Sequence, residues 1–204
     1  MINPLFAKLF GSMLENKISK WAEEGDKRAK GQAGLRPRHS TIDHGITLRH
    51  IIEKVWEKKE EAFCCFVDFK KAFDTVPRDK LWHRMEELGV PMHLRAAVLR
   101  LYEEVKVKII TSTSISKSFR SHIGVKQGCP LSPTLFGLYI DKLEEWLNLH
   151  DDDGALLGEY VIRLLLYAYD LILIAKSTLG LQEHLLSLEL FCRTMGMQIN
   201  TSKT

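Results

Sequence analysis

The stretch Leu164-Leu165-Leu166-Tyr167-Ala168-Tyr169-Asp170-Leu171-Ile172-Leu173-Ile174 decides the fold. Two apolar runs of strand length flank a short polar break, a pattern that predicts a β-hairpin. The break carries Asp170, and a carboxylate between buried strands is costly unless a cation or a hydrogen-bond donor meets it. A second apolar run, Phe63–Val67, ends in another carboxylate, Asp68. If the two strands share a sheet, their acidic ends are a way to hold a divalent cation.

The other elements predict an α+β domain in which an antiparallel sheet packs on helices. Helical spacing and end signals predict helices at about 4–24, 41–57, 77–88, 91–104, 132–149 and 178–195. Strands are expected at 63–69, in a hairpin of 105–111 and 115–125, and at 197–200. The continuous apolar run of the strand at 63–69 predicts burial on both faces. Residues 151–158, which are acidic and contain glycine, are expected to form a loop.

Composition narrows the class of protein. A chain of 204 residues can bury a sizeable core as one domain or two subdomains, and 45% hydrophobic residues is ordinary for a globular protein. The four cysteines have no CxxC spacing, so a zinc site or disulfide framework is not expected. Reduced thiols and the lack of a signal peptide indicate an intracellular protein of the nucleus or cytoplasm. No apolar run approaches the roughly 20 residues of a membrane span, so a membrane partner is not expected.

Charge is distributed unevenly, although the net charge is only +3. The segment Val105–Pro133 has no acidic residue. Its basic residues are Lys106, Lys108, Lys117, Arg120 and Lys126, and acids collect instead at Asp141, Glu144, Glu145 and Asp151–Asp153. This asymmetry suits a nucleic acid running along one side of the molecule. A pair of solvated faces explains it equally well.

Five segments resemble, in sequence order, the motifs of reverse transcriptases. Motif A is matched by Phe66–Asp74, motif B by Gly124–Pro133, motif C by Tyr167–Asp170 and motif D by Gly196–Thr204. The fifth segment, Gln32–Pro37 with Ser40–Asp43, resembles the fingers segment of non-LTR (LINE-type) retrotransposon enzymes. Group II intron enzymes share motifs A to D. The LINE-type assignment therefore depends on the fingers segment and on Lys71–Pro77.

The resemblance implies a right-hand polymerase fold. Residues 1–62 would be partial fingers and 63–204 the palm, with a fingers/palm hairpin at about 105–125, and the thumb is expected to be absent. The implied activity is RNA-directed DNA polymerase, a nucleotidyltransferase activity that uses an RNA template, a DNA primer, dNTPs and Mg²⁺ or Mn²⁺. Asp68 and Asp170 would be the metal ligands.

The resemblance also assigns the nucleotide site. Phe73 would be the steric gate that excludes a ribose 2′-OH, with core packing as the alternative. Gln127 and Gly128 would lie against the incoming nucleotide and the template. Triphosphate contacts would come from Arg36 and from Lys71 or its neighbour Lys70, and Lys203 would be a general acid. Each of these charges has a solvated or frayed surface residue as its alternative.

Tyr169 departs from the family pattern. Motif C of the family has two adjacent aspartates, of which the first binds metal directly, and here that position is Tyr169 while Asp170 remains. A phenol is neutral near pH 7 and is much bulkier than a carboxylate. Because of Tyr169 and of the expected absence of a thumb, this copy is expected to be weak or inactive as a polymerase. The alternatives are a non-catalytic remnant that binds RNA or an RNA/DNA duplex, and a decaying retroelement fragment with no selected role.

Overall fold

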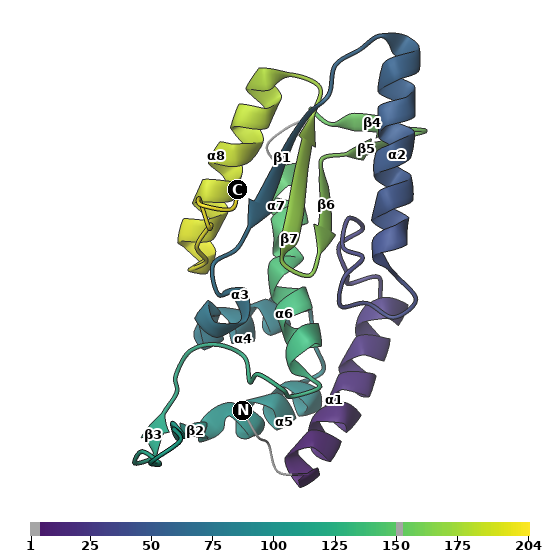
Figure 1. The fold of residues 1–204 in the computed structure, drawn as a ribbon. Helices are drawn as coiled ribbons and strands as arrows, with labels where there is room; N and C mark the ends of the chain where they lie inside the picture. Colours follow the sequence, from purple (N-terminus) through teal and green to yellow (C-terminus); the bar gives the residue numbers. More distant parts are fainter. Residues whose placement is uncertain (1–4, 150–152) are drawn as a thin grey trace.

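The computed structural model describes residues 5–149 and 153–204. At its centre is a three-stranded sheet in the order β1 (Phe63–Asp68), β7 (Asp170–Ala175) and β6 (Leu164–Tyr167). Both neighbouring pairs are antiparallel, and β6 and β7 form the hairpin that the opening stretch predicts. Figure 1 shows this sheet with α8 on one side and α2 on the other.

The side chains on the two faces of the sheet pack in two different apolar clusters. Leu164, Leu166, Leu171 and Leu173 pack in the main core with residues of the helices. Leu165 and Ile174 point the other way and pack on Ile51. The prediction that β1 is buried on both faces is wrong, because Phe66 is 61% exposed and lies outside both clusters.

Helices cover the sheet and form the lower part of the molecule (Figure 1). Their bounds are α1 (Leu5–Glu24), α2 (Thr41–Lys58), α3 (Ala72–Thr75), α4 (Arg78–Glu87), α5 (Met92–Glu103), α6 (Ser132–Ile140), α7 (Lys142–Asn148) and α8 (Thr178–Met195). The single helix predicted at 132–149 is two helices that meet at Asp141. Asp141 is buried, and its pairing with Arg28 offsets the cost of burying the carboxylate.

Two smaller hairpins complete the fold. β2 (Lys106–Val107) and β3 (Phe119–Arg120) are shorter than predicted, and backbone hydrogen bonds such as Ser116 N–H to Ile109 O continue the ribbon beyond them. The loop predicted at 151–158 instead begins a hairpin, with β4 (Ala155–Leu157) paired to β5 (Tyr160–Ile162). The acidic residues 151 and 152 lie outside the described residues. None of the described helices is both long enough and apolar enough to cross a membrane.

Candidate active site

Two carboxylates meet at one end of the central sheet. Asp68 ends β1 and Asp170 begins β7, and the two residues are opposite each other in the strand register. Residues opposite each other in antiparallel strands project from the same face, so both carboxylates lie on one side of the sheet. Burial and the negative charge of Asp68 raise the pKa of Asp170 above its usual value. This is the electrostatic situation that a cation relieves.

The C-terminal segment contacts Asp68 directly. The Asn200 side chain donates a hydrogen bond from Nδ2 to Asp68 Oδ2 at 2.8 Å, and its backbone N–H donates to Asp68 O at 2.8 Å. Lys203 Nζ lies 3.9 Å from the same carboxylate oxygen. Asn200 lies in the segment Gly196–Thr204 that resembles motif D, and the sequence alone assigned it no role. Its amide is the one side chain in the described residues that donates a hydrogen bond to this carboxylate.

Two aromatic side chains, Phe73 and Tyr169, line the same pocket as Asp68. Phe73 stacks on Phe136 with ring centroids 4.5 Å apart, and Tyr169 meets the Phe73 ring edge-on at 6.1 Å and 89°. Phe73 therefore packs against the core and also lines a pocket, so the predicted steric-gate role and the core-packing alternative are compatible. Tyr169 occupies space beside the predicted gate residue.

The pocket gathers seven of the predicted site residues, counting Lys70, the alternative to Lys71. Its volume is about 440 Å³, and its lining includes Asp68, Lys71, Phe73, Gln127, Tyr169 and Lys203. A second pocket of about 410 Å³ on the neighbouring surface is lined by Asp170, Tyr167 and His44, and it shares Asp68 and Lys203 with the first. Asp68 thus borders two open concave surfaces and Asp170 borders one of them, and neither surface is a closed cavity.

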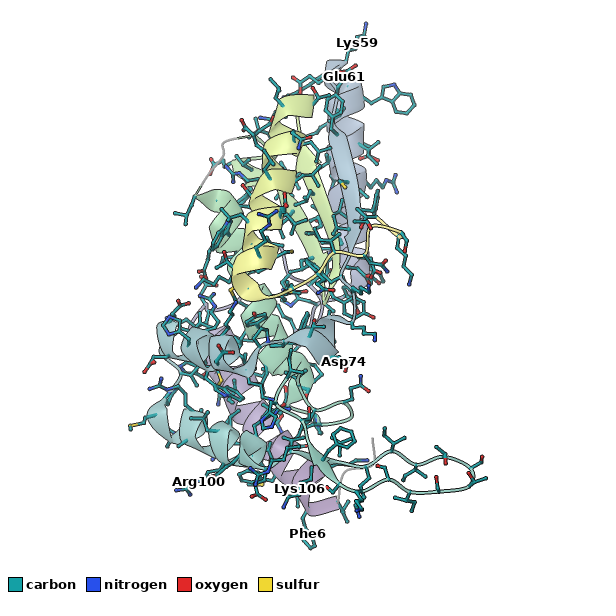
Figure 2. All side chains as sticks on the ribbon, turned by 90° about the vertical axis from the view of Figure 1, so that its left-hand side faces the viewer. Phe6, Lys59, Glu61, Asp74, Arg100 and Lys106 are labelled. Carbon is teal, nitrogen blue, oxygen red and sulfur yellow. The ribbon has the colours of Figure 1, made fainter. Side chains whose placement is uncertain are left out.

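Gln127 and Gly128 lie on the loop that leads into α6. Gln127 Nε2 donates to Asp74 Oδ1 at 2.5 Å, which joins this loop to α3 beneath the pocket, and Figure 2 labels Asp74 on that helix. Gly128 has φ of +77°, a backbone conformation that favours glycine. The loop is also held by Arg78, whose guanidinium donates to the carbonyl oxygens of Gly124, Ser121 and Ile123. Sequence reasoning did not single out Arg78.

Arg36 lies away from this pocket. Its guanidinium pairs with Glu23 at 2.6 Å and donates to the backbone oxygens of Ala29 and Gln32. Burial raises the pKa of Glu23, but the hydrogen bond and charge of Arg36 outweigh it and hold that pKa below its usual value. Arg36 therefore shapes its own loop, and its contact with a triphosphate stays a prediction.

Of the five basic residues of the predicted nucleic-acid surface, three contact other protein groups and two are exposed without an ion pair among the described residues. Lys126 is half-buried and donates to Leu101 O, while Lys106 and Arg120 pair with Glu104 at 2.8 and 3.2 Å. Lys108 and Lys117 are exposed and have no ion pair within the part of the chain that is described. Figure 2 shows this hairpin, next to the label of Lys106, extending away from the body of the molecule.

The donor set at the paired carboxylates suits a hard cation only in part. Mg²⁺ binds carboxylate oxygens and takes its remaining ligands from water or substrate phosphates. Asp68 and Asp170 supply two carboxylates, but no group of three His, Cys, Asp or Glu side chains that could hold a metal occurs in 5–149 and 153–204. Tyr169 stands next to Asp170 without adding a third charge.

An antiparallel sheet packed on helices is consistent with the palm and fingers fold of a polymerase. Solved telomerase structures share this fold. The apo telomerase of Candida tropicalis, truncated from its C-terminal domain, superposes with a TM-score of 0.66 over 95% of this chain and 39% of its own, at 14% identity. The Candida albicans telomerase in complex with a TWJ fragment of telomeric RNA also gives 0.66, at 14% identity, over 95% and 34%.

Sequence similarity gives the family. Residues 3–204 match the reverse transcriptase (RNA-dependent DNA polymerase) family, so the chain belongs to that family. It is 28% identical to the R2 retrotransposon Pol polyprotein of Nasonia vitripennis over 85% of this chain. It is 29% identical to the probable RNA-directed DNA polymerase from transposon BS of Drosophila melanogaster over 97%. It spans 18% and 22% of the lengths of these relatives.

Proposed function

We propose that this chain forms the palm (63–204) and part of the fingers (1–62) of a non-LTR retrotransposon RNA-directed DNA polymerase. The reaction is the addition of dNTPs to a DNA primer on an RNA template, and this copy is weak or inactive. The observation that carries the proposal is the register pairing of Asp68 with Asp170 beside the pocket that contains Phe73 and Gln127.

Asp68 and Asp170 would hold Mg²⁺ together with oxygens of the triphosphate. Bound metal ions would stabilise the charge that develops on the attacking and leaving oxygens. The chain's own groups bind and orient the substrate. Phe73 would exclude a 2′-OH by contact, and Lys71 and Lys203 would provide positive charge at the rim of the pocket.

Tyr169 accounts for the weak activity. It places a neutral ring beside Phe73, at the position where the family has a metal-binding aspartate. Loss of a charged ligand removes stabilisation of the transition state, and the ring occupies space next to the nucleotide pocket.

Primer extension with Mg²⁺ and with Mn²⁺ on an RNA template tests the proposal. We expect no extension by the native chain and measurable extension by Tyr169→Asp, which Asp68→Ala abolishes in that background. Robust extension by the native chain that depends on Asp68 would refute the weak-copy proposal. If Tyr169→Asp also fails, Tyr169 is not the limiting defect.

A second candidate is a non-catalytic module that binds RNA or an RNA/DNA hybrid. It is supported by Lys108 and Lys117 on the projecting hairpin, which have no ion pair with any residue that the structure describes, together with the altered motif at Tyr169. Salt-sensitive binding without any extension by Tyr169→Asp would favour this candidate.

A further inference from the structure

The turn at the tip of the β6–β7 hairpin is held by a glutamine from far along the chain. Gln32 is fully buried. Its Oε1 accepts the backbone N–H of Ala168 at 2.9 Å, and its Nε2 lies 3.4 Å from Ala168 O as a donor. Ala168 has φ of +60°, which non-glycine residues rarely adopt. Such a conformation persists where the surrounding structure fixes it.

The loop that carries Gln32 runs directly beside β6. Ala33 N–H donates to Leu166 O at 2.9 Å, and Leu166 N–H donates to Gly31 O at 2.8 Å, so the loop continues the sheet for one residue in parallel. A Cβ added to Gly34 would lie 2.1 Å from Ala168 N. Only glycine therefore allows the loop to approach the turn this closely.

The other side of the loop is anchored to the helices. Arg28 Nε pairs with Asp141 Oδ2 at 2.6 Å in the interior, and the backbone N–H of Ala29 donates to the same oxygen at 3.3 Å. Glu144 accepts the backbone N–H groups of Lys30 and Gly31 at 2.6 and 2.9 Å. The loop that holds the turn through Gln32 is thus itself fixed to the junction of α6 and α7 by residues 28–31.

We propose that Gln32 is a positioning residue for Asp170. It fixes the backbone of Ala168, two residues before the carboxylate, and so determines where the Tyr169 and Asp170 side chains point. This inference rests on the proposed function, in which Asp170 is a metal ligand. No contact between Gln32 and a substrate is part of it.

Hydrogen exchange of the Ala168 amide tests the positioning without any activity. The variant Gln32→Met keeps the side-chain volume and removes both polar atoms, so the buried amide loses its acceptor. We expect exchange at residues 167–170 to accelerate about tenfold or more through local opening, while exchange in α8 stays unchanged. The matched control is Gln198→Met, an exposed glutamine near the site, which should leave both regions unchanged.

Kinetics in the Tyr169→Asp background distinguish positioning from a general loss of structure. Adding Gln32→Met should lower kcat about tenfold and change the KM for dNTP less than about twofold, because carboxylate placement matters most in the transition state. Unchanged exchange at Ala168 overturns the inference, and so does accelerated exchange with unchanged kcat. Accelerated exchange without extension by Tyr169→Asp supports the positioning of the turn and counts against the proposed function.

Discussion

Asp68 and Asp170 occupy the same register position on neighbouring strands, so two carboxylates share one end of the sheet. Asn200 and Lys203 approach Asp68, whereas the shift of the Asp170 pKa reflects burial and repulsion by Asp68. The protein therefore keeps an unfavourable pair of charges at the place where the proposed function needs a cation. Groups arranged for binding a ligand commonly lower the stability of the free protein.

Removing this repulsion should stabilise the fold. We expect Asp170→Asn to raise the free energy of unfolding at neutral pH by up to about 1 kcal/mol, a small value because the group is mostly exposed to solvent screening. Urea denaturation in the absence of divalent ions measures the change. Glu57→Gln, on the exposed face of α2, is the control and should have no measurable effect. A destabilised Asp170→Asn protein would show that the charge repulsion is not dominant.

The Arg28–Asp141 pair should be among the most sensitive positions. Both side chains are 1% exposed, so Asp141→Asn leaves a buried guanidinium without its partner at 2.6 Å and with the Glu23 carboxylate 3.9 Å away. The expected loss is about 3–5 kcal/mol in the free energy of unfolding. Chemical denaturation checks it, with Glu53→Gln as the control because the Arg49–Glu53 pair is exposed. A small change at Asp141 would mean that water reaches the pair.

The Glu23–Arg36 pair predicts an acid-dependent stability. Because the pKa of folded Glu23 is lowered, its contribution is present above the unfolded-state pKa of about 4.3 and is lost as pH falls through the folded value. Arg36→Met should cost about 1–2 kcal/mol at neutral pH and flatten this acid dependence. Thermal unfolding from pH 7 to pH 3 measures both effects. Glu24→Gln, an exposed neighbour, should leave the profile of the native chain unchanged.

The hairpin lysines predict a salt-dependent affinity for nucleic acid. The double variant Lys108→Gln/Lys117→Gln should bind an RNA/DNA hybrid more weakly, and the slope of log K against log salt should fall by about 1 for each lost phosphate contact. Binding titrations at several salt concentrations measure the slope. Lys54→Gln/Lys58→Gln is the control, since the end of α2 marked by Lys59 lies at the opposite end of the molecule from Lys106 (Figure 2). Equal losses in both variants would argue for non-specific attraction.

Local patterns were sufficient for much of the architecture. The hairpin of β6 and β7, the Ser40 cap of α2 and the end of α8 at Gly196 follow from periodicity and from end signals a few residues long. Burial was predicted less well, because an apolar run does not say which neighbour covers each face. Phe66 shows this, since it belongs to a continuous apolar strand and is still exposed.

Contacts between residues far apart in the sequence limited how much of the candidate site could be predicted. Asp68 and Asp170 could be expected near each other, but the roles of Gln32 and Asn200 depend on partners more than a hundred residues away. No local pattern encodes such contacts. Charge patterning misled for a similar reason: Asp141 and Glu144 appeared to belong to an acidic surface, yet both bind the loop of residues 28–31.

The hydrogen bond between Gln32 and Ala168 joins residues 136 positions apart in the sequence. During synthesis Arg36 of the loop of residues 28–36 can pair with Glu23 early, but the loop's contacts with Asp141, Leu166 and Ala168 form only after most of this chain has emerged. Contacts of such long sequence separation carry a large loop-closure cost and slow folding. A deletion that removed only the first helix and this loop would therefore affect the folding of the C-terminal sheet, which makes the protein a poor candidate for dissection into smaller independent parts.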